Sequence, residues 1–117
     1  MEQKMEHRMN IRMPVSMPAT VYYPGNGGHE SCRAMTRNLG FGGACLEAGE
    51  TPPSKGTIVR LAMDNAGGDP VVIDALVLRN DAEGLGIMFA YYGDDVFQRL
   101  ASMLQPVSEQ HYAHDLR

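Results

Sequence analysis

The sequence has no apolar run long enough to cross a membrane, few cysteines and no excess of positive charge. Its longest apolar runs are residues 71–73 and 75–78, whereas a membrane-spanning helix needs roughly 20 apolar residues. Residues 1–12 are polar and mixed in charge, which is not the pattern of a secretory signal. Two cysteines, Cys32 and Cys45, are too few for a disulfide scaffold. These absences predict a cytoplasmic protein that does not insert into a membrane.

The charge of the chain is negative overall and unevenly placed. Ten basic and 14 acidic side chains give a net charge of −4, which argues against a general nucleic-acid binder. Residues 1–46 carry five Lys/Arg and three acids, whereas residues 47–117 carry five and eleven. A locally basic region on an acidic protein favours a small anionic ligand over a long polyanion.

Alternating apolar residues predict a small all-β domain. A chain of 117 residues fits one domain, and its 13 glycines and 7 prolines imply many tight turns. The alternation predicts a six-stranded antiparallel β-barrel, with a glycine-rich turn over residues 38–43. The expected strands lie at residues 15–23, 30–37, 44–48, 57–64, 71–79 and 85–91.

The two ends of the chain differ from this pattern. Asp94 can cap a helix whose apolar stripe holds Val96, Leu100 and Met103, beside Phe97 and Leu104. Pro106 is expected to end that helix, which would lie over one opening of the barrel. The expected organisation is a flexible N-terminal arm at residues 1–14, the barrel with its helix at residues 15–105, and a mobile tail at residues 106–117.

Two short motifs carry the candidate binding residues. Arg8 and Arg12 are four residues apart, so they share one side of the chain in a helix or a strand. Each arginine offers a planar fork of donors that suits phosphate or the edge of guanine. The second motif, residues 38–43, begins with the amide of Asn38 and supplies glycines that let a ligand approach the backbone. Taken separately, the first motif is more typical of a solvated arm, and the second is more typical of a hairpin turn.

Taken together and in this order, the motifs resemble the PilZ domain. That family is marked by Arg-x-x-x-Arg and, further along the chain, Asp/Asn-x-Ser-x-x-Gly, which Arg8 to Arg12 and Asn38 to Gly43 match here. Leu85-Gly-Ile-Met-Phe89 is similar to the family's penultimate strand, and the closing helix follows it. The resemblance covers residues 6–104. It implies a six-stranded barrel that binds the bacterial second messenger cyclic di-GMP.

The resemblance also implies a role for each motif residue. Arg8 and Arg12 would grip phosphate and guanine edges, Asn38 would hydrogen-bond a guanine, and Gly43 would keep the turn open. Arg79 is an additional candidate contact. No bond is made or broken, so the implied protein is a receptor and not an enzyme, with no cofactor, catalytic residue or metal.

Two positions depart from the family pattern. Gly40 replaces the motif serine, which removes a neutral hydrogen bond worth about 0.5–1.5 kcal/mol. Because the charge-assisted bonds of an arginine are worth about 1.5–3 kcal/mol each, we expect weaker binding rather than none. His7 stands where many relatives carry another arginine, so we expect the affinity to rise as the pH falls through about 6.5.

The implied partners are cyclic di-GMP and an unidentified protein target, with a role in motility or biofilm regulation and a chain that is a monomer or a weak homodimer. The alternative is a PilZ-like adaptor that has lost the ligand and works through protein contacts alone. Gly40 favours this alternative, whereas Arg8 and Arg12 oppose it.

Other constellations have simpler explanations. A copper(I) site needs the methionines at positions 1, 5, 9, 13 and 17 on one helix, which Pro14 breaks. A zinc site could use His29, Cys32 and Cys45 if a hairpin sets the two cysteines nearly opposite each other, but buried reduced thiols are the simpler interpretation. His111 and His114 lie in the expected tail, where ordering the ligands costs entropy. Tyr92-Gly-Asp-Asp matches a viral polymerase signature, but the chain is too short for such an enzyme.

Overall fold

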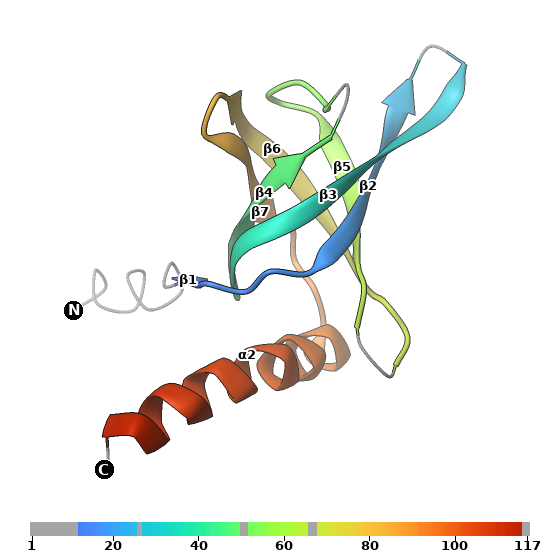
Figure 1. Ribbon diagram of the computed structural model, residues 1–117. Helices are drawn as coiled ribbons and strands as arrows, with labels where there is room; N and C mark the ends of the chain where they lie inside the picture. The colour runs from blue at the N-terminus through green and yellow to red at the C-terminus, as the bar shows by residue number, and fades with distance from the viewer. Residues whose placement is uncertain (1–11, 26, 50–51, 66–67, 116–117) are drawn as a thin grey trace, which may run out of the picture.

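The computed structural model describes residues 12–25, 27–49, 52–65 and 68–115, which form one antiparallel sheet and one helix (Figure 1). The sheet contains seven strands, and six of them close into the predicted barrel. The elements are β1 (Arg12–Met13), β2 (Pro18–Gly25), β3 (Gly28–Gly40), β4 (Gly43–Ala48), β5 (Ile58–Met63), β6 (Val71–Asp81), β7 (Gly84–Phe89) and α2 (Asp94–Asp115).

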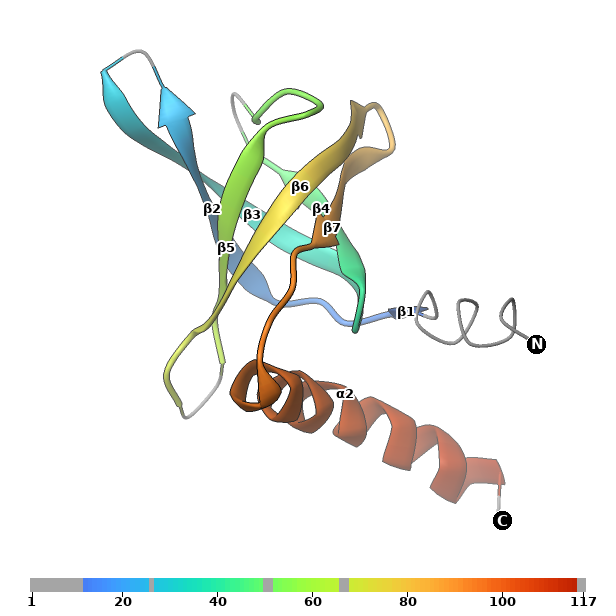
Figure 2. The same cartoon turned by 180° about the vertical axis from the view of Figure 1, so that it is seen from behind.

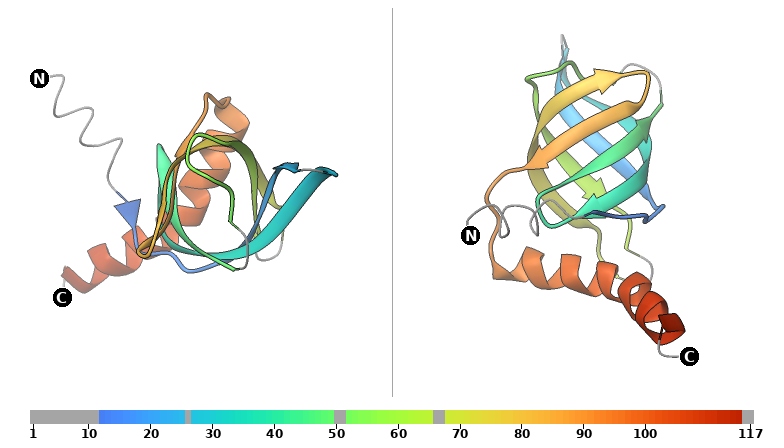
Figure 3. Two further views of the ribbon diagram at one scale, coloured as in Figure 1. Left: turned by 90° about the horizontal axis from the view of Figure 1, so that it is seen from above. Right: turned by 90° about the vertical axis from the view of Figure 1, so that its left-hand side faces the viewer.

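The barrel closes because β3 pairs with both β2 and β4. The strand order is β1-β3-β2-β5-β6-β7-β4, and the additional pairing of β3 with β4 completes the ring. Figure 2 shows β2, β5 and β6 side by side on one flank, and Figure 3 shows the ring from above. The helix α2 runs across the lower opening of the barrel (Figure 1).

The barrel interior holds the apolar residues whose alternation predicts the strands. Removing them from water is the main driving force for closing the ring, at about 25 cal/mol per Å² of apolar surface. On α2, Leu100 and Leu104 are buried against this core. No helix in the described part of the chain is long and apolar enough to span a membrane. The buried strand residues include Ala19, Val21, Val59, Leu61, Met63, Val71, Ile73, Ala75, Val77, Leu85, Ile87 and Phe89.

The helix continues past Pro106, so the prediction that this proline ends it is wrong. A proline in a helix interior removes one hydrogen bond and crowds the preceding turn, at a cost of about 3 kcal/mol. Its fixed φ is nevertheless a helical value, so the residue disfavours the helix without excluding it. The mobility of residues 106–117 stays a prediction.

Several strand boundaries also differ from the sequence prediction. β3 runs through Gly40 because Asn38 pairs with Cys45 and Gly40 pairs with Arg12, so only the segment between β3 and β4 remains a turn. Arg12 therefore belongs to a short strand rather than to a free arm. β2 begins at Pro18 rather than at Val15.

Candidate functional site

Arg12 is held at the barrel surface by backbone pairing and by one buried hydroxyl. β1 places Arg12 opposite Gly40. The hydroxyl of Thr36, which is buried, donates to the carbonyl of Val15 and accepts from the N–H of Met17 at 2.9 Å. These bonds hold the segment between β1 and β2 against β3. They position the Arg12 side chain beside the motif turn.

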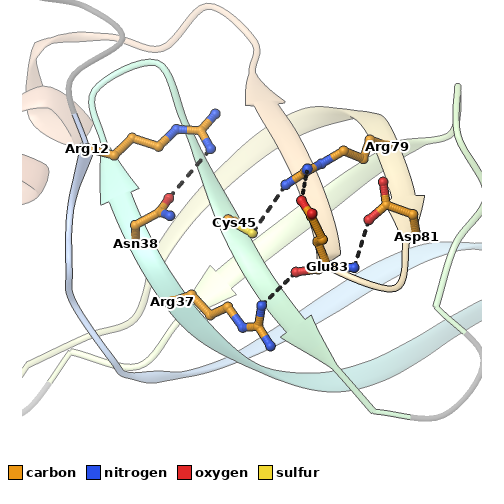
Figure 4. A network of polar contacts seen from close by, with 7 residues as sticks. All are labelled: Arg12, Arg37, Asn38, Cys45, Arg79, Asp81 and Glu83. Carbon is orange, nitrogen blue, oxygen red and sulfur yellow. Dashed lines mark hydrogen bonds and ion pairs between the residues drawn. The ribbon is translucent and has the colours of Figure 1, made fainter.

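The Arg12 guanidinium lies over a glycine and beside an amide. Its Nη1 is 3.5 Å from Oδ1 of Asn38 (Figure 4), a long hydrogen bond that leaves the donors of the fork largely available. A Cβ at Gly43 would lie 3.2 Å from Nη2 of Arg12 and 2.2 Å from the carbonyl oxygen of Ile87. Glycine is therefore required at position 43 because β4 approaches β7 closely there and because the guanidinium lies across it.

Arg12 differs from the other described arginines in its charge environment. Each of the others has a carboxylate oxygen within 4.0 Å: Arg33 with Asp64, Arg37 with Glu47, Arg60 with Asp74, Arg79 with Glu83, and Arg99 with Asp69 and Asp95. Within the described part of the chain, Arg12 forms no ion pair. Its charge is consequently available to an anion from outside the protein.

Two β-bulges turn Asn38 and Arg79 outward. Strict alternation would aim Asn38 inward after the core-facing Thr36, and Arg79 inward after the core-facing Val77. The register shifts between Thr36 and Asn38 in β3, and between Val77 and Arg79 in β6. A bulge re-aims the side chains that follow it. Both candidate residues therefore lie on the outer side of the barrel.

Asn38, Cys45, Gly86 and Arg79 form a row across β3, β4, β7 and β6, because each pairs with the next in register. We call these four residues the outer row. Cys45 alternates with core residues and so belongs to the outer side, where Nη2 of Arg79 lies 3.6 Å from its sulfur (Figure 4). In the middle of the row, Gly86 and the thiol of Cys45 thus lie beneath the guanidinium of Arg79.

The turn between β6 and β7 binds two arginines. Nη1 of Arg79 donates to Oε1 of Glu83 at 3.2 Å, and Nη1 of Arg37 donates to the Glu83 carbonyl at 2.7 Å (Figure 4). Arg37 also donates to the Glu47 carboxylate at 3.0 Å, and this hydrogen bond raises the pKa of Arg37 above its ordinary value. The sequence does not single out Arg37, because alternation places it and Asn38 on opposite sides. Only the bulge brings both toward the surface.

The motif turn is fixed to the start of α2. The hydroxyl of Tyr92 donates to the carbonyl of Phe41 at 2.5 Å, and the rings of Phe41 and Phe97 stack with centroids 4.8 Å apart. Burial raises the pKa of Tyr92, so the phenol remains a donor at neutral pH. These contacts fix the turn between β3 and β4 to the start of α2.

The predicted binding residues separate into three groups. Arg12, Asn38, Gly40 and Gly43 come together where β3 meets β4. Arg79 reaches the same outer side from β6. Arg8 and His7 lie outside the described residues, so their placement stays a prediction.

The structure does not bring Cys32 and Cys45 opposite each other, contrary to the sequence prediction. Cys32 pairs with Val21, whereas Cys45 pairs with Asn38, because β3 extends well beyond the end of β4. Cys32 lies in the core, and burial raises the pKa of its thiol. Among the described residues, no three metal-binding side chains cluster.

Comparison with known proteins gives one family and one fold. A family model described as the PilZ domain matches residues 6–105. Nine chains of solved structures match, among them the PilZ domain of CeSA from a cellulose-synthesizing bacterium. That structure has a TM-score of 0.61 and 18% sequence identity, over 87% of this chain and 99% of that one. No curated protein matches the sequence.

Proposed function

The chain belongs to the PilZ domain family, a family of cyclic di-GMP receptors. On that premise we propose that it binds cyclic di-GMP and passes the signal to a protein target. A PilZ domain is a ligand-binding domain rather than a catalytic one. The protein would act in the bacterial cytoplasm, in the regulation of motility or biofilm formation.

The observation that carries this proposal is the Arg12 guanidinium, which has no carboxylate partner among the described residues. Cyclic di-GMP supplies two phosphates and two guanines. A guanidinium binds phosphate oxygens, or O6 and N7 of guanine, through two parallel hydrogen bonds. The Asn38 amide lies beside it and both donates and accepts, which suits the edge of a guanine.

Arg8 would supply a second fork from the segment that precedes β1. Because it lies four residues before Arg12, it would face the same side of the chain as Arg12. The ligand would then order the N-terminal arm over the surface of the barrel. An ordered arm creates or covers a surface for the protein target, so binding shifts the population of one signalling state.

The alternative is an adaptor without ligand, and Gly40 favours it. Gly40 pairs directly with Arg12, so the family's serine would place its hydroxyl next to that guanidinium. Glycine supplies no such hydrogen bond. An adaptor would use the barrel surface for protein contacts and would leave Arg12 unoccupied.

Isothermal titration of cyclic di-GMP into the purified protein distinguishes the two functions, with GTP as the control nucleotide. Saturable binding of cyclic di-GMP in the micromolar range or tighter, with none of GTP, would support the receptor. The stoichiometry would give one ligand or two. Absence of heat, together with an unchanged melting temperature at high ligand concentration, would contradict it and favour the adaptor.

A further inference from the structure

Arg79 holds its guanidinium flat against the barrel wall. Nη1 donates to Oε1 of Glu83 at 3.2 Å, and Nη2 lies 3.6 Å from Sγ of Cys45. A Cβ at Gly86 would be 3.1 Å from Nε of Arg79 and 3.8 Å from both Cζ and Nη2. One face of the guanidinium therefore rests over Gly86, while two of its nitrogen atoms already have partners within the protein.

The Arg79 side chain is 42% exposed, and because Gly86 lies under one face of the guanidinium, we take the opposite face to be the one that a ligand can reach. A phosphate that approached the nitrogen atoms in the plane would meet the Glu83 carboxylate, which repels it and competes for the same donors. A flat aromatic ring on the open face displaces neither partner. Guanidinium planes are established stacking surfaces for nucleobases, through cation–π attraction and dispersion.

The two guanidinium groups lie at a separation that one dinucleotide can span. Arg12 covers Gly43, and Arg79 reaches Cys45, two residues further along β4. Two residues of a strand span about 7 Å. A ligand held by Arg12 would therefore extend over the Arg79 plane.

We propose that Arg79 stacks its open face on a guanine of cyclic di-GMP, and that Glu83 and Gly86 are positioning residues that keep the plane against the wall. This inference rests on the proposed function and assigns a role within the same site. Arg79 would recognise the aromatic base, whereas Arg12 would supply the charge for the anion.

Two substitutions separate a stacking role from a phosphate contact. Arg79→Lys keeps the positive charge and loses the plane, whereas Arg79→Trp keeps a plane and loses the charge. The chain contains five tyrosines but no tryptophan, so the tryptophan emission of Arg79→Trp, excited where tyrosine does not absorb, reports on position 79 alone. Arg60→Lys and Arg60→Trp are matched controls, because Arg60 is another exposed arginine with a carboxylate partner, Asp74. Circular dichroism and melting temperatures verify that each variant folds.

Stacking predicts that Arg79→Lys weakens cyclic di-GMP binding about tenfold, because one base-stacking contact has a value of that order. Arg79→Trp should stay within about threefold of the wild type. Its fluorescence should be quenched on titration, while that of Arg60→Trp should not change.

Binding retained by Arg79→Lys and lost by Arg79→Trp would overturn stacking in favour of a phosphate contact. Unchanged binding by both variants would remove Arg79 from the site and leave the proposed function standing. Equal losses by both folded variants would also reject stacking. No binding by the wild-type protein would overturn the proposed function, and this inference with it.

Discussion

Two rows of residues cross the outside of the same barrel, and only one of them lies beside an arginine that has no ion pair among the described residues. One is the outer row of Asn38, Cys45, Gly86 and Arg79; the other is Ser31, Tyr22, Arg60 and Asp74, which are register partners across β3, β2, β5 and β6. In the second row Arg60 lies directly opposite Asp74, and the two side chains form an ion pair at 3.0 Å. The outer row has two small residues at its centre, and near it Arg12 forms no ion pair among the described residues.

The groove in the barrel surface and the arginine without an ion pair among the described residues lie on different flanks of the barrel. A groove of about 490 Å³ lies on the second flank, where Tyr22, Ile58, Arg60 and Asp74 contribute to its lining. The arginine in that groove, Arg60, is paired with Asp74, whereas Arg12 on the other flank has no such partner among the described residues. We therefore place the ligand by charge and donor chemistry rather than by the size of a hollow. The predictions below test this choice, from the largest expected effect to the smallest.

Replacing Arg12, which forms no ion pair among the described residues, should have the largest effect. Arg12→Ala should raise the Kd for cyclic di-GMP by between about tenfold and a hundredfold, because the lost charge-assisted bonds are worth about 1.5–3 kcal/mol. Arg60→Ala removes an exposed arginine from the other flank and should leave the Kd unchanged. Isothermal titration measures both, and equal losses by the two variants would refute the comparison between the flanks.

Adding a single carbon to Gly43 should disturb both the barrel and its ligand. The new Cβ would overlap the Ile87 carbonyl oxygen and press on Arg12, so Gly43→Ala should lower the free energy of unfolding by about 1–3 kcal/mol. Gly27 has nothing within 4 Å of an added Cβ, so Gly27→Ala should change stability by less than about 0.5 kcal/mol. Urea denaturation tests this difference. Equal stabilities of the two variants would mean that β4 can withdraw from β7 without cost.

Restoring the missing hydroxyl should sharpen the site. Gly40→Ser places a hydroxyl opposite Arg12 and should tighten cyclic di-GMP binding about two- to tenfold, the value of one neutral hydrogen bond. The measurement is the Kd of the variant against that of the wild type. An unchanged Kd in a variant with a normal melting temperature would show that the hydroxyl does not reach the ligand.

The smallest effect should come from pH. A protonated His7 adds a positive charge near the anion, so affinity should be greatest below about pH 6.5 and fall as the histidine loses its proton. An exposed charge pair contributes about 0.2–1 kcal/mol, which corresponds to at most about fivefold in Kd. Titrations of the wild type and of His7→Ala across this pH range test the idea, and identical pH profiles would refute it.

Local patterns in the sequence predict most of the barrel but not its two irregularities. Alternation correctly predicts which residues of β5 and β7 face the core, because neither strand contains a register shift. The same rule fails at Asn38 and Arg79, since a bulge depends on how two strands meet rather than on the residues of one strand. Arg37 and Glu83 escape prediction for a similar reason: their contact joins β3 to a turn far along the chain.

The sequence alone determined the fold class and the chemical groups of the candidate site, because the period of apolar residues and the types of side chain are local properties. The tertiary structure decided which charges are neutralised and which remain available. It paired Arg60 with Asp74 across two strands, placed Arg12 over Gly43, and turned Arg79 outward to lie on Gly86. These outcomes depend on strand register, which is set by the closure of the whole barrel, and no single segment of the chain contains that information.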